Sequence, residues 1–138
     1  AGEDWMEEKQ RISALLQEEA SLQEMVRLVG EDALSAPDRL KMETARSIRE
    51  DLLQQNAFMA EDTYTSLHKL MHLILSFYDI CQQALEKGAN IEKLVSMEVR
   101  EPIGRFKYTA EDQVDARYNE IEQALMKEAD DVAAAKEE

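Results

Sequence analysis

Glycine, proline and cysteine are all scarce in this sequence, and each scarcity excludes a class of structure. The 138 residues include four glycines and two prolines, too few for the many turns of an all-β or α/β domain. The single cysteine, Cys81, excludes an internal disulfide and makes a reducing compartment the default expectation. No apolar run reaches the roughly 18 residues that a membrane-spanning helix needs.

Positive charge is scarce too. Sixteen lysines and arginines stand against 30 acidic residues, which gives a formal net charge of -14. This balance argues against nucleic acids and anionic membrane surfaces as partners. It is compatible with a basic protein partner, although solubility alone would also account for an acidic surface.

Recognisable catalytic motifs are missing from the chain. Its glycines, Gly2, Gly30, Gly88 and Gly104, are too far apart to form a phosphate-binding loop followed by Lys and Ser or Thr. A Gly-x-Ser-x-Gly nucleophile motif is absent as well. We therefore expect no catalytic residues and no catalysis by this chain alone.

Good helix formers (Ala, Leu, Glu, Gln and Lys) dominate the composition, and the length suits one domain. We predict an all-α, single-domain bundle of about five helices. Apolar spacing places these helices at residues 4–29, from Ser35 to about residues 54–56, from residues 62–63 to 87, at 90–97, and from Thr109 onward. Residues 98–108 are expected to form a connection that Pro102 and Gly104 break.

Several helix ends carry local signals. Gly30 suits a left-handed position after the first helix. Ser35 and Asn90 are predicted N-caps for the second and fourth helices. Thr109 with Asp112 resembles a capping box that would open the last helix.

Apolar stripes predict which residues are buried. The first helix has a stripe that comprises Ile12, Leu15, Leu16, Leu22, Met25, Val26 and Val29. The third helix is apolar nearly all round, so it should be the central and most buried one. Cys81 lies on it and is expected to be a small buried hydrophobe, and the seven methionines are expected to fill the core.

His68 and His72 lie four residues apart, with Asp79 two turns further on, and could begin a metal site. The Glu of the zinc-protease motif and an obvious closing ligand are missing. We therefore expect two surface histidines on a polar strip and no metal site.

Two stretches flank the second helix. The loop before it carries Glu31 and Asp32, and the segment after it carries Phe58. The loop acids could contact a partner or be surface charge, and Phe58 could contact a ligand or anchor a turn. Spacing alone favours the simpler interpretation in both cases.

Four blocks of the sequence resemble one known family. They are LVGEDALSAPDRL (28–40), ARSIREDLLQQNAF (45–58), DTYTSL (62–67) and IGRFKYTAEDQ (103–113). These blocks are similar to the C-terminal helical domain of the catalytic A subunit of archaeal and vacuolar-type rotary ATPases. The resemblance runs from about Leu16 to Tyr118 and implies the helical bundle that follows the nucleotide-binding domain in that subunit.

The resemblance implies that the loop before the second helix contacts the central rotor stalk. The rotor-contact residues would be Asp32, Leu34, Ser35 and Asp38. The acidic version of this loop carries further carboxylates, where this chain has Ala33, Ala36 and Pro37. Contact would then depend more on shape and on Leu34 than on charge.

The resemblance also implies that Gln55, Asn56 and Phe58 lie on the adenine side of a nucleotide site. ATP or ADP with Mg would bind only in the complete subunit, and this chain by itself would hold no cofactor. The expected partners are the non-catalytic B subunit and the central stalk. The location would be the cytoplasmic face of a membrane, without insertion into it.

The chain would then be part of a larger subunit whose phosphate loop lies upstream. An alternative is a free-standing acidic helical adaptor that binds a basic or amphipathic partner helix in a groove. That alternative requires an exposed apolar groove.

Overall fold

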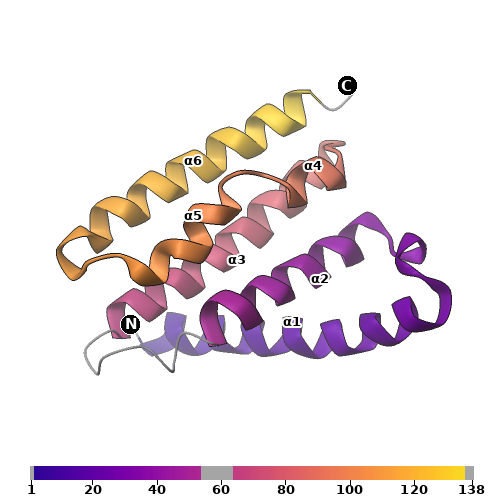
Figure 1. Ribbon diagram of the computed structural model, residues 1–138, viewed down its shortest axis with the longest axis horizontal. Helices are drawn as coiled ribbons and strands as arrows, with labels where there is room; N and C mark the ends of the chain where they lie inside the picture. The colour runs from indigo at the N-terminus through magenta and orange to yellow at the C-terminus, as the bar shows by residue number, and fades with distance from the viewer. Residues whose placement is uncertain (1, 54–63, 136–138) are drawn as a thin grey trace.

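A computed structural model describes residues 2–53 and 64–135, and within them the chain forms helices and no strand (Figure 1). The α-helices are α1 (Gly2–Val29), α2 (Ala36–Ser47), α3 (Tyr64–Glu86), α4 (Ile91–Val95), α5 (Arg100–Arg105) and α6 (Val114–Ala134). Short 3-10 turns are η1 (Glu31–Ala33), η4 (Phe106–Tyr108) and η5 (Glu111–Gln113), and η2 (Ile48–Leu53) is a π-helical continuation of α2. The all-α prediction is confirmed. None of these helices is long and apolar enough to cross a membrane.

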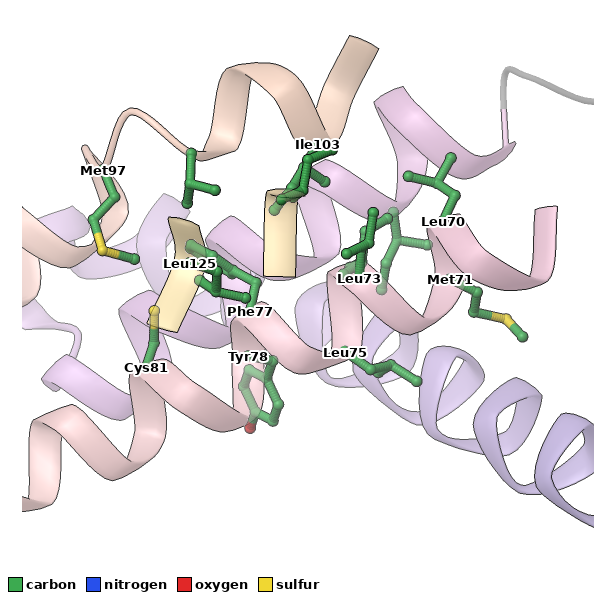
Figure 2. Close-up of a cluster of buried hydrophobic side chains, with 14 of the residues drawn as sticks. Leu70, Met71, Leu73, Leu75, Phe77, Tyr78, Cys81, Met97, Ile103 and Leu125 are labelled. Carbon is green, nitrogen blue, oxygen red and sulfur yellow. The ribbon is translucent and has the colours of Figure 1, made fainter. Parts of the chain in front are cut away.

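Helix α3 lies at the centre, with the antiparallel pair α1 and α2 on one side and α6 on the other (Figure 1). Its side chains Leu70, Leu73 and Phe77 are buried, and they meet Ile103 of α5 and Leu125 of α6 in one cluster (Figure 2). Each such side chain contributes about 1.5–3 kcal/mol when fully buried. The prediction that this helix is the central one is confirmed.

The stripe predicted on α1 is only partly buried. Ile12, Leu15 and Leu22 lie in the core, but Met25 is 40% exposed and Val29 is 63% exposed. Every residue from Arg27 to Ala33 is exposed. A helix of 28 residues is roughly 42 Å long, and its last turns extend past the helices that cover its earlier ones. The expectation that Met25 and Val29 are buried is therefore wrong.

The predicted caps before α2 and α4 are confirmed. The Ser35 side chain accepts a hydrogen bond from the backbone amide of Asp38 at 3.3 Å. The Asn90 side chain accepts one from the amide of Lys93 at 3.1 Å. Gly30 has the expected positive φ of 94°, but its ψ of 159° extends the chain away from α1 instead of curling it.

The capping box predicted at Thr109 is wrong. The amide of Thr109 closes η4 by donating to the Phe106 carbonyl at 3.0 Å, so Thr109 ends a turn where a helix start was predicted. The turn η5 follows, and α6 begins only at Val114, without a side-chain cap.

The predicted connection over residues 98–108 is also wrong, because most of it is helical. Pro102 lies in the first turn of α5, where no intrahelical amide donor is needed. The Glu128 carboxylate of α6 accepts hydrogen bonds from the amides of Glu98 and Val99, at 2.7 and 2.9 Å. This distant carboxylate satisfies amides that local sequence leaves without partners.

Arg100 attaches α5 to α2. Its guanidinium donates to Glu43 Oε1 at 2.8 Å and to Ser47 Oγ at 2.9 Å. It also donates to the Val95 carbonyl at 2.9 Å and lies 5.3 Å from the centre of the Phe77 ring. Arg100 is therefore a structural residue that holds α5 against α2.

The single cysteine provides a test of this packing. Cys81 is fully buried, and burial raises the pKa of its thiol to about 12. We expect no reaction between native protein and an aromatic disulfide reagent at pH 8, because neither thiolate nor access is present. The exposed variant Ser13→Cys should react at once, and guanidinium should make Cys81 react fully. Prompt labelling of native wild-type chain would contradict the packing of α3.

Candidate functional site

The turn between α1 and α2 forms one end of the molecule along its longest axis (Figure 1). The turn η1 is closed by hydrogen bonds from the amides of Ala33 and Leu34 to Gly30 and Glu31 carbonyls, at 3.2 and 3.1 Å. Asp32 is exposed, and Leu34 is half-buried against the hairpin. The hairpin therefore presents to solvent an acidic turn that two backbone hydrogen bonds close.

Ser35 and Asp38 complete the predicted rotor-contact set. Both lie at the start of α2, where Ser35 is exposed and Asp38 half-buried. The Asp38 carboxylate lies in the first turn of the helix, where negative charge is favoured by the exposed amides. Both residues have a local role in starting α2, whatever they contact outside the domain.

Sequence reasoning missed the apolar surface beside this turn. Leu28 is 78% exposed, and it adjoins Val29 and Met25 on the last turns of α1. We call these three residues the apolar tip. Residues at i, i+3 and i+4 share one helix face, so they form one patch. The apolar periodicity included Met25 and Val29, which it predicted to be buried, and did not include Leu28.

Acidic groups border the apolar tip. Arg27 pairs with Glu24 one turn away, and Glu31 and Asp32 are the exposed acids at the turn. Neither makes an ion pair within residues 2–53 and 64–135. The nearby Arg39 pairs instead with Glu92 of α4 at 2.5 Å. The border of the tip is therefore net negative.

The predicted adenine-side residues Gln55, Asn56 and Phe58 lie outside the described residues, and their roles stay predictions. The helix that leads toward them ends in η2, which two contacts hold. Arg49 of η2 forms a two-pronged ion pair with the buried Glu19 of α1, at 2.5 and 3.1 Å. Lys107 donates to the Glu50 carbonyl at 3.3 Å. Short π-helical segments are frequent at functional sites.

A polar cleft of about 460 Å³ lies between η2 and α5. Its charged lining includes Arg46, Glu50, Asp51, Arg105 and Lys107. Burial raises the pKa of the Asp51 carboxyl, and the nearby Lys107 ammonium opposes that rise. A Cβ on Gly104 would lie 3.1 Å from Asp51 Oδ1, so glycine lets α5 approach η2 closely.

The two histidines are partly exposed, with 30% of the His68 side chain and 44% of the His72 side chain accessible, and they face acidic groups of neighbouring helices. His72 Nδ1 lies 2.9 Å and His68 Nε2 lies 3.2 Å from the Glu8 carboxylate of α1. His72 Nε2 lies 3.6 Å from Glu122 of α6. The pair therefore links three helices.

Asp79, the third residue of the possible metal site, is engaged elsewhere. It accepts two hydrogen bonds from Arg11, at 2.5 and 3.1 Å. Residues 2–53 and 64–135 contain no group of three His, Cys, Asp or Glu side chains arranged to hold a metal ion.

Fold and site together define an all-α domain with a protruding, acidic helix–turn–helix end. Residues 1–95 match the family described as the C-terminal domain of V and A type ATP synthase. The chain belongs to this family, as its resemblance predicted.

Relatives whose sequences match most of this chain agree with this assignment. The V-type ATP synthase alpha chain of Acetivibrio thermocellus is 55% identical over 125 residues, which is 88% of this chain and 21% of that protein. The alpha chain of Clostridium botulinum (strain Okra / Type B1) is 50% identical over 128 residues, and that of Clostridium novyi (strain NT) is 48% identical over 136. These matches cover 88% and 96% of this chain. The chain spans about a fifth of the length of these relatives, between 21% and 23%.

The Ser35 cap is a test of how the turn is built. We expect Ser35→Ala to lower the free energy of unfolding by about 1 kcal/mol, because the amide of Asp38 loses its acceptor. Urea unfolding followed by circular dichroism measures this loss. Ser13→Ala, an exposed change in the middle of α1, is the control and should have almost no effect. Equal stability of wild type and Ser35→Ala would show that the Ser35 side chain does not stabilise the start of α2.

Proposed function

We propose that this chain is the helical domain of the catalytic subunit of an ion-translocating rotary ATPase or ATP synthase. The observation that carries the proposal is the family match over residues 1–95, which include the whole α1–α2 hairpin and α3. The relatives' name, V-type ATP synthase alpha chain, supports it. In the complete enzyme, the domain transmits conformational change to the central stalk through Asp32, Leu34, Ser35 and Asp38.

The packing of α2 suits such transmission. Helices α2 and η2, of 12 and 6 residues, together span roughly 25 Å. Leu40, Ala45 and Ile48 on this rod are fully buried. Close-packed interiors transmit displacement with little deformation. A displacement at the η2 end of these helices would therefore reach the turn η1 at the start of α2.

At its other end, the rod leads toward Gln55, Asn56 and Phe58, which we assign to the adenine side of the nucleotide site. ATP or ADP with Mg binds in the complete subunit, and the phosphate chemistry belongs to the rest of that subunit. The non-catalytic B subunit and the central stalk are the partners. The assembly lies on the cytoplasmic face of the membrane.

The free-standing adaptor is less well supported. It requires an apolar groove, but the cleft between η2 and α5 is lined mainly by charged and polar residues. A second cleft, between α5 and α6, is bordered by Glu98, Glu101, Lys127, Glu128 and Asp131. The first cleft is therefore a poor match for the apolar face of a partner helix.

Isolated domain and nucleotide should interact only weakly. Stacking of one aromatic ring on a base contributes about 1–3 kcal/mol, whereas a millimolar dissociation constant requires about 4 kcal/mol. We expect ATP to bind the isolated chain more weakly than roughly 1 mM, as measured by calorimetric titration. Tight, saturable binding that Phe58→Ala abolishes would contradict the proposal that nucleotide binds only in the complete subunit.

The turn is tested in the assembled enzyme. We expect Asp32→Ala with Leu34→Ala to leave the melting temperature of the domain almost unchanged, because neither side chain is in the core. Ion pumping per ATP hydrolysed should fall, because the turn between α1 and α2 loses its contact with the central stalk. Glu120→Ala, an exposed change on α6, serves as the matched control. Undiminished pumping in the double variant would remove the turn from the mechanism.

A further inference from the structure

We propose that the groove between α5 and α6, the α5–α6 groove, is a docking site for one amphipathic helix of a partner protein. The partner helix presents aliphatic side chains to the groove and lysine or arginine at its edges. The groove lies on other elements than the α1–α2 turn and η2. The inference therefore goes beyond the proposed function and does not depend on it.

The groove exists because α5 and α6 both pack on α3 (Figure 1). Ile103 of α5 and Leu125 of α6 turn toward Phe77 of α3 in the buried cluster (Figure 2). The sides that α5 and α6 turn toward each other at the surface enclose a groove of about 570 Å³. Sites that bind ligands in proteins have volumes of roughly 300–1,000 Å³, so this groove is large enough to receive side chains of a partner.

Part of the lining is apolar. It comprises Val99 and Pro102, at the start of α5, and Ala124 of α6. Pro102 is half-buried and Ala124 is exposed, so the aliphatic side chains of a partner can contact both. The apolar surface covered in this way is the main source of affinity when a helix binds in a groove.

The lining of α6 has the shape that a helix requires. Ala124, Lys127, Glu128 and Asp131 line the groove, and positions i, i+3, i+4 and i+7 share one face of a helix. This face extends over roughly 10 Å along α6. A straight face of that length matches a second helix lying along α6 better than it matches a compact small molecule.

Glu128 holds the two sides of the groove together. Its carboxylate accepts hydrogen bonds from the backbone amides of Glu98 and Val99, at 2.7 and 2.9 Å. Because Glu128 belongs to α6 and the two amides lie just before α5, these bonds fix the separation of the two helices. A groove that is already formed loses little conformational entropy when a partner binds.

The charges at the border indicate the chemistry of the partner. Glu98 and Glu101 on the α5 side and Asp131 on the α6 side are exposed. Lys127, the one lysine in the lining, forms an ion pair with Asp131 at 3.0 Å. An apolar lining with a net negative border is complementary to an amphipathic helix with basic edges, and it disfavours an acidic partner.

A peptide probe tests the groove in the full 138-residue chain. The probe is a fluorescein-labelled peptide of about 14 leucines and lysines, with leucine every three or four positions so that its helix has one apolar face. A peptide of the same composition in scrambled order is the control. Binding is measured by fluorescence anisotropy in about 0.15 M salt, which screens long-range attraction to the acidic surface.

Ala124→Glu separates docking in the groove from simple charge attraction. The added carboxylate strengthens charge attraction but puts a polar group into the apolar lining. We expect the probe to bind Ala124→Glu at least fivefold more weakly than wild type. Ala116→Glu adds the same charge at an exposed position of α6 outside the groove and should bind the probe as wild type does.

Charge reversal tests the border. Glu98→Lys with Glu101→Lys should weaken binding at least tenfold, because the basic edge of the probe then meets lysines. Glu111→Lys with Asp112→Lys changes the net charge equally at exposed positions of η5 and should weaken binding less than twofold. All four side chains are exposed, so the circular dichroism spectra of both variants should match that of wild type.

Nuclear magnetic resonance locates the bound probe. The expected changes in amide chemical shift lie on α5 and α6 around the groove, and changes confined to the α1–α2 turn would overturn the inference. Equal affinity of wild type and Ala124→Glu would also overturn it, as would equal binding of the ordered and scrambled peptides or no binding of either. None of these outcomes bears on the proposed function, because the probe replaces neither the stalk nor the nucleotide.

Discussion

The burial of α3 is the constraint on which the rest of the structure depends. This helix carries large apolar side chains on nearly every side, so it is stable only when other helices enclose it. The α1–α2 hairpin covers one side, and α5 and α6 cover the other (Figure 1). Because these helices must cover α3, their polar faces and their connecting turns are left at the surface, where a partner can reach them.

Ion pairs then fix how the covering helices sit on this core. Arg100 ties α5 to α2 through Glu43, and Arg49 ties η2 to α1 through Glu19. His68 and His72 meet Glu8 where α1 crosses α3. Hydrophobic burial is not directional, whereas paired charges have specific geometry. These contacts therefore hold α2 in one position against the core.

Local signals in the sequence predicted much of the fold. Ser35 and Asn90 act within their own turns, so residue type alone revealed them. Helix α5 was missed, because its stability depends on Glu128 and Glu43, which are distant in sequence. The apolar tip was assigned to the core, because periodicity gives the face of a helix but not the length of the helices that cover it. The roles proposed for the two ends of α2 come from the family resemblance alone, because spacing favoured simpler interpretations at both ends.

The π-helical form of η2 has a geometric consequence for whatever follows Leu53. A π turn holds one more residue than the α turn it replaces, so η2 contains a register offset of one residue. If η2 relaxed to α-helical form, the chain beyond it would rotate about the rod axis by about 100° and advance by about 1.5 Å. The ion pair between Arg49 and Glu19 and the bond from Lys107 to Glu50 are the contacts that oppose that motion.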